Sequence, residues 1–229
     1  MRVLVVAAAV VAAGVSSGCT QTSDGHPVAD SAVAPRVTTA TSTAPATTGS
    51  ASPDVPAMGV TPTLREAVPP NALVCLPTPA AGTPVTVQVS DAAAPKIVVA
   101  LPEGWISAPS PGGLTLTGPD GMAGAVDIGR TALDPAAAFE KYTDDVSALA
   151  PVSSVSVLPA ENCGYSGQRL MGVLSGGQDG ARTYEDRIGH VWTDEGDYLV
   201  TIHVAAPQGS PAFDAAAATL TADFAITLP

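Results

Sequence analysis

The sequence predicts an α+β fold, a largely antiparallel β-sheet flanked by helices. From about residue 85 onward, apolar and polar residues alternate in short runs separated by turns rich in Gly and Pro, which is typical of strands with one buried face. Two amphipathic segments interrupt these runs, which favours helices packed on the sheet. The expected strands are Val85–Val89, Lys96–Pro102, Leu114–Gly118, Gly124–Leu133, Ser154–Leu158, Gln168–Leu174, Arg182–Thr193 and Tyr198–Ala206.

The first helix is expected to begin with Asp134 as N-cap and Pro135 in its first turn, a favoured pair, and to end before Pro151. Its apolar residues recur at spacings of three and four, which predicts one buried stripe: Phe139, Tyr142, Val146 and Leu149.

A second helix is expected to begin at Ser210 and Pro211. Its buried face is predicted to hold Phe213, Ala217, Leu220 and Phe224. A shorter helix, Leu64–Val68, is expected behind a Thr63 cap.

The N-terminus has the features of a bacterial export signal. Arg2 precedes an uncharged apolar run, Val3–Ala13, which is too short to span the roughly 30 Å of a bilayer core as a helix. The run leads into Ser16-Ser17-Gly18-Cys19, which resembles the lipobox of bacterial lipoproteins with Ser16 where Leu is usual. That resemblance implies a signal peptide over residues 1–19 and a lipid on Cys19. The alternative is ordinary cleavage that leaves a free Cys19.

Composition divides the rest of the chain. Residues 20–62 are mostly Thr, Ser, Ala and Pro, so they predict a disordered tether that is either a bare spacer or a carrier of O-linked glycans. Residues 63–84 form a lead-in segment and residues 85–229 the globular domain. The chain has a net charge of −12 and nine Lys and Arg residues, which argues against nucleic acid as a partner.

Several segments of the globular part resemble one known family. Leu101–Trp105 (LPEGW) and Leu133–Phe139 (LDPAAAF) resemble segments of the mycobacterial LpqN-type lipoproteins and the related proline-rich secreted antigen. Gly189–Val204 resembles their penultimate hairpin, and Phe224–Pro229 resembles their closing strand. The resemblance implies a PsbP-like α/β/α sandwich on the outer face of the cell membrane. The family brings no catalytic residue to transfer.

The expected last hairpin carries two histidines and several acidic residues, which are candidate metal ligands. A turn at Glu195-Gly196 would place His190 opposite Thr201 and His203 diagonally beside it, with Asp186 as the one acidic residue of matching strand parity. This set favours a structural or solvent-facing histidine pair over a metal site. The acidic residues at the turn are Asp194, Glu195 and Asp197, and they suit a hairpin turn better than a Ca²⁺ site. No metal or other cofactor is expected.

Catalytic motifs are weak. The loop Cys163–Gly167 (CGYSG) does not match a nucleophile elbow, because Gln168 stands where a Gly is needed. The candidate ligand-facing residues are Trp105, Tyr165, Trp192, His190 and His203, and core packing is the alternative for the two tryptophans.

The remaining cysteines predict a disulfide. With Cys19 lipidated, Cys75 and Cys163 form an even set in an exported protein. A bridge between them would attach the Pro-rich lead-in to the sheet. The alternative is two buried thiols.

Together these observations predict a non-enzymatic binding module of the cell envelope, lipid-anchored and extracytoplasmic, with an unknown protein or a small apolar ligand as partner. The alternatives are a hydrolase or enzyme accessory with a scattered site, and a lipid carrier. A histidine bonded to both a carboxylate and a hydroxyl would favour the enzyme. A carrier needs an apolar cavity that fits an acyl chain.

Overall fold

The computed structural model describes residues 57–62, 65–177 and 180–229. The predicted signal peptide, Cys19, the tether up to residue 56 and the Thr63 cap lie outside the described residues. Within these ranges, no helix is both long and apolar enough to cross a bilayer.

The strands of the described residues form two antiparallel sheets rather than the single sheet expected. The α+β class itself is confirmed. The larger sheet has seven strands in the order β4 (Ile106–Ser110), β5 (Gly113–Thr117), β6 (Ala123–Thr131), β10 (Gly196–Pro207), β9 (Arg182–Thr193), β8 (Gly167–Ser175) and β7 (Val152–Pro159). The smaller has four, in the order β1 (Leu73–Cys75), β11 (Ala225–Thr227), β3 (Lys96–Leu101) and β2 (Thr83–Val87).

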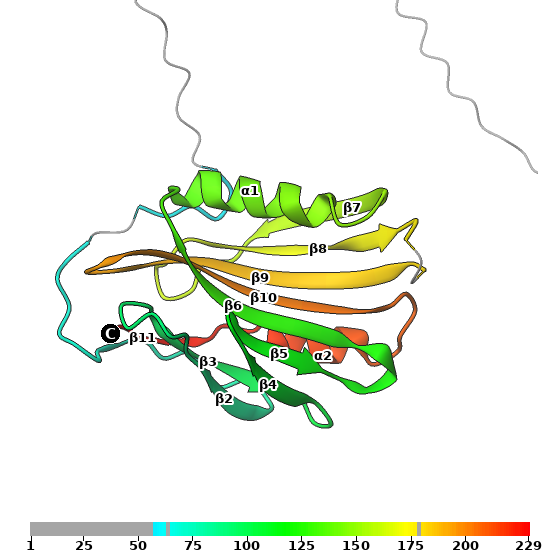
Figure 1. Cartoon of the computed structure of the whole chain (residues 1–229), viewed down its shortest axis with the longest axis horizontal. Helices are drawn as coiled ribbons and strands as arrows, with labels where there is room; N and C mark the ends of the chain where they lie inside the picture. The colour runs from blue at the N-terminus through cyan, green and yellow to red at the C-terminus, as the bar shows by residue number, and fades with distance from the viewer. Residues whose placement is uncertain (1–56, 63–64, 178–179) are drawn as a thin grey trace, which may run out of the picture. The chain divides into compact units, whose positions relative to one another are not determined.

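Helix α1 (Pro135–Ser147) covers one face of the larger sheet, and α2 (Phe213–Leu220) together with the smaller sheet covers the other (Figure 1). Helix α1 packs on the face of β7, β8 and β9, whereas α2 lies against β10 and β3. A single-turn helix, η1 (Pro119–Gly121), joins β5 to β6. The protein has two hydrophobic cores, one on each face of the larger sheet, because side chains along β10 point alternately to the two faces. Val200, Ile202 and Val204 enter the core that includes the smaller sheet, whereas Leu199 packs in the core with α1.

Helix α1 begins as predicted but ends earlier. The Asp134 carboxylate accepts the Ala137 N–H at 2.9 Å, and Pro135 opens the helix. Phe139 and Val146 are buried. Leu149 lies beyond the last helical residue, Ser147, so it leaves the predicted stripe and is 68% exposed.

The prediction of the short helix is wrong, and the second helix exists but with a different start. Arg65–Val68 is not helical. Helix α2 begins at Phe213 rather than Ser210, because the Ser210 hydroxyl donates to the Pro207 carbonyl at 2.7 Å and closes a separate turn. Phe224 follows the helix, yet it is 2% exposed and belongs to the core.

The hairpin of β9 and β10 has a different register from the one expected. Its turn is Asp194-Glu195, and Gly196 pairs with Thr193. The Thr193 hydroxyl accepts the Glu195 N–H at 3.3 Å and so closes the turn one residue early. His190 therefore lies opposite Leu199, not Thr201, and His203 lies opposite Asp186.

The last residues of the predicted tether belong to the folded part. The Gly59 carbonyl accepts the Gly167 N–H at 2.9 Å, and Gln168 Nε2 donates to the Met58 carbonyl at 2.7 Å. Gly59 has φ of +72°, and a Cβ there would lie 2.1 Å from the Gly167 oxygen, so only glycine allows this approach. The boundary at residue 62 is therefore too late, because residues 58 and 59 are already bonded to the start of β8.

Candidate functional site

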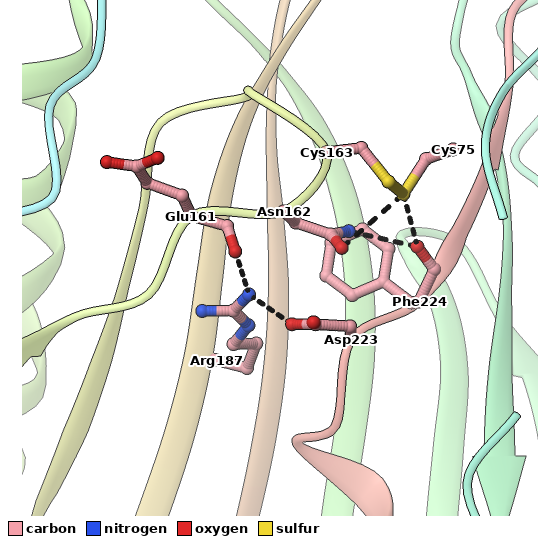
Figure 2. Close-up of a disulfide and its surroundings, with 7 residues drawn as sticks. All are labelled: Cys75, Glu161, Asn162, Cys163, Arg187, Asp223 and Phe224. Carbon is pink, nitrogen blue, oxygen red and sulfur yellow. Dashed lines mark hydrogen bonds and ion pairs between the residues drawn. A yellow bond between two sulfur atoms is a disulfide. The ribbon is translucent and has the colours of Figure 1, made fainter. Parts of the chain in front are cut away.

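A disulfide joins β1 to the loop before β8. The Sγ atoms of Cys75 and Cys163 are bonded, their Cα atoms lie 5.5 Å apart, and 88 residues separate them in the sequence. The predicted bridge is confirmed (Figure 2). It attaches the lead-in segment to the larger sheet.

The loop that carries Cys163 is a tight two-residue turn. Asn162 and Tyr165 exchange backbone hydrogen bonds of 3.1 and 3.0 Å across it. The central residues, Cys163 and Gly164, have φ of +52° and +83°. Such turns prefer Asn and Gly, and a side chain in the left-handed region costs about 1–2 kcal/mol. Cys163 adopts this unfavourable conformation because the backbone hydrogen bonds between Asn162 and Tyr165 close the turn around it.

A buried arginine supports this loop from below (Figure 2). Arg187 of β9 is 2% exposed and donates to the carbonyls of Ala160 and Glu161 and, at 2.8 Å, to the Asp223 carboxylate. Burial lowers the pKa of Arg187, and Asp223 opposes that shift. The loop is therefore held by charge-assisted hydrogen bonds as well as by the disulfide.

Polar contacts surround the disulfide itself. Asn162 Nδ2 donates to the Phe224 carbonyl at 2.9 Å. The Cys75 Sγ atom lies 3.4 Å from Asn162 Oδ1 and 3.3 Å from the Phe224 oxygen, which are packing contacts because a bridged sulfur has no proton to donate. Sequence reasoning did not single out Asn162, Arg187 or Asp223. The adjacent charges of Asp186 and Arg187 in the middle of a buried strand were the available signal.

Strand β1 separates two hollows of the surface. Leu73 lines an apolar groove of about 350 Å³, whereas the next residue, Val74, lines a second cavity of about 440 Å³. We call the first the apolar groove. It is lined chiefly by apolar residues of the lead-in segment and the smaller sheet, with Asp223 as its charged residue, and it includes Leu73, Leu76, Pro79, Val99, Ala100 and Ala225.

The second cavity contains two of the predicted ligand-facing residues. The rings of Tyr165 and Trp192 lie 6.2 Å apart at 48°, and the two side chains are 5% and 7% exposed. Burial raises the pKa of Tyr165. The indole Nε1 of Trp192 has no hydrogen-bond partner in the described part of the chain. The structure brings this pair together, and their contact with a ligand stays a prediction.

Trp105 and His190 lie elsewhere, and each has a packing role. Trp105 is 6% exposed and covers Gly118, where an added Cβ would lie 2.4 Å from the indole ring. His190 is buried, with Nε2 3.0 Å from the Leu133 carbonyl at the entry to α1. The two histidines are four residues apart in register, about 14 Å along the strands, so they do not form the pair expected.

His203 is bonded to a buried carboxylate instead. Its Nδ1 lies 2.5 Å from Oδ1 of Asp186, which is fully buried, and Tyr184 stacks on the imidazole. Burial and the nearby Asp186 raise the pKa of Tyr184 to about 12. Within the described ranges, no serine, threonine or cysteine is hydrogen-bonded to His203, and no cluster of side chains suits a metal ion. The hydrolase alternative requires a histidine bonded to a carboxylate and to a hydroxyl. In the described residues His203 has the carboxylate, that of Asp186.

Comparison with known proteins finds similar solved structures but no sequence relative. No protein-family model matches the chain, and no curated protein matches it in sequence. The crystal structure of LpqN, a protein involved in cell envelope biogenesis of Mycobacterium tuberculosis, superposes with a TM-score of 0.50 at 16% identity, over 63% of this chain and 91% of that one. The chain shares the fold of LpqN.

Two further solved structures are less similar. The Ran-binding protein Mog1p of Saccharomyces cerevisiae matches with a TM-score of 0.38 at 14% identity, over 56% of this chain and 78% of its own. The solution structure of cyanobacterial PsbP (CyanoP) from Synechocystis sp. PCC 6803 matches with a TM-score of 0.36 at 18% identity, over 65% and 97%.

Proposed function

We propose that this protein is an LpqN-type binding module of the cell envelope, anchored by a lipid on Cys19, non-enzymatic, and specific for a small apolar ligand. The apolar groove is the observation that carries the proposal. Its volume of about 350 Å³ falls within the roughly 300–1,000 Å³ of small-molecule sites. It is large enough for one slender apolar chain or ring system.

The chemistry of the groove favours an apolar ligand. Leu73 and Leu76 at its rim are 53% and 72% exposed, so a ligand that covers them removes apolar surface from water at about 25 cal/mol per Å². Asp223 lies at the groove and is tied to buried Arg187. A ligand with a hydrogen-bond donor at one end therefore suits the groove best.

Binding can be tested with the neutral fluorescent probe N-phenyl-1-naphthylamine. The variant Leu76→Asp places a charge in the groove at an exposed position, so the fold should persist while affinity falls about tenfold. Ile106→Asp, at a residue of β4 that is 67% exposed and outside the groove, is the matched control. Equal probe binding by both variants would contradict the assignment of the groove.

Export and anchoring are supported by the N-terminal pattern and by the Cys75–Cys163 bridge, because disulfides persist in oxidising compartments. Globomycin should cause the precursor to accumulate. Cys19→Ala should release the protein from the membrane fraction or leave it uncleaved. Unchanged membrane fractionation of that variant would refute a lipid on Cys19.

The Asp186–His203 pair favours one alternative, a hydrolase in which Asp186 orients the imidazole as a general base. Hydrolysis of p-nitrophenyl butyrate separates the two functions. A rate above buffer that is lost in His203→Gln but kept in Leu76→Asp would replace the binding proposal by the hydrolase. A rate equal to buffer for the wild-type protein agrees with a binding module.

A further inference from the structure

Four strands lie at sheet edges in the described part of the chain, and three of them are blocked or short. Strand β4 contains Pro109, β2 contains Pro84, and β1 has three residues. Strand β7 is different: it has eight residues, no charged side chain, and its proline, Pro159, stands at the last position. An edge strand exposes unpaired backbone N–H and C=O groups, and proteins normally protect such edges with charge or proline. Strand β7 has no charged side chain, and its terminal proline leaves residues 152–158 without protection.

Apolar side chains line this unprotected edge. Val152, Val155 and Leu158 are 60%, 37% and 46% exposed, and Leu149 just before the strand is 68% exposed. On its other side β7 is fully paired with β8, from Val152 opposite Ser175 to Pro159 opposite Gln168. The free edge thus offers both backbone groups and apolar surface to a further strand.

We propose that β7 pairs antiparallel with β7 of a second copy of this chain, about a twofold axis through Val155. The sequence of β7 selects this register. With the axis at Val155, that residue faces its own copy, Val152 faces Leu158 of the second copy, and Ser154 faces Ser156.

Neighbouring symmetric registers are poorer. An axis at Ser154 places Val155 opposite Ser153 and Val152 opposite Ser156. An axis at Ser156 places Leu158 opposite Ser154. Because each exposed apolar side chain meets another only with the axis at Val155, this register buries the most apolar surface.

The size of the contact sets the strength of the dimer. Eight residues give a strand about 27 Å long, so the edge alone buries less than the roughly 1,200 Å² of a stable interface. The dimer is therefore weak and exchanges with the monomer. Each chain also carries a net charge of −12, so copies repel one another until salt reduces the screening length to about 10 Å near 0.1 M. Association should strengthen as salt is raised.

Sedimentation velocity of the purified protein tests this. The sedimentation coefficient should rise with concentration over about 10–500 µM, a range that matches affinities of about −5 to −7 kcal/mol, and rise further in high salt. Val155→Lys should remain monomeric, whereas Ile106→Lys on the blocked edge β4 should behave as wild type. A wild-type protein that stays monomeric throughout, or a Val155→Lys variant that still dimerises, overturns the proposal.

Cross-linking tests the register independently of strength. Val155→Cys should form a covalent dimer on mild oxidation because the two copies of this residue face each other, while Ser154→Cys, which faces Ser156, should give far less. Equal yields from the two variants would show that the copies meet elsewhere and would refute the register.

Discussion

Removing the disulfide should destabilise the protein more than any single contact in it. The bridge closes a loop of 88 residues, and the chain-entropy relation then gives about 4.6 kcal/mol at 25 °C as the upper value. For a folded part of this size, about 2–4 °C of melting temperature per kcal/mol converts this to a fall of roughly 9–18 °C.

The left-handed conformation of Cys163 lets this prediction be sharpened by a second variant. Replacing Cys163 by Ala leaves a strained side chain at φ of +52°, whereas Asn tolerates that region. In a Cys75→Ala background, the Cys163→Asn protein should therefore be about 1 kcal/mol more stable than the Cys163→Ala protein.

Thermal and urea unfolding followed by circular dichroism measure these differences, with refolding checked so that equilibrium values apply. A loss below about 1 kcal/mol in the doubly substituted proteins would refute the loop-entropy argument. Equal stability of the Asn and Ala variants would refute the strain assigned to Cys163.

Two further predictions concern buried polar groups. Arg187→Leu removes the hydrogen-bond donor for two carbonyls and for Asp223, so the free energy of unfolding measured in urea should fall by about 2–3 kcal/mol. A loss under about 1 kcal/mol would show that water replaces the guanidinium. All four tyrosines have raised pKa values, with burial as the first cause, and Tyr184 reaches about 12. Because the unfolded phenols lose their protons near pH 10 and the folded ones later, stability should fall as the pH rises from about 10 to 12. Absorbance at 295 nm checks this, since phenols that ionise near pH 10 in the native protein would contradict it.

Local patterns of the sequence determined much of the fold. Alternation identified most strands, the Asp134-Pro135 pair located the start of α1 to the residue, and the two cysteines left after Cys19 predicted the bridge. These predictions are correct because each depends on local information: a hydrophobic period of two or 3.6 residues, a capping residue within three positions of the helix start, or a small number of possible cysteine partners.

Tertiary structure alone decided the rest. The Thr193 hydroxyl closed the hairpin one residue early, which moved His203 opposite Asp186 and away from His190. The burial of Arg187 depends on carbonyls and a carboxylate that lie 26 to 36 residues away in the chain. Register and the pairing of buried charges are set by long-range packing, and a change of one turn residue alters which side chains face each other along the whole strand. No local period carries that information.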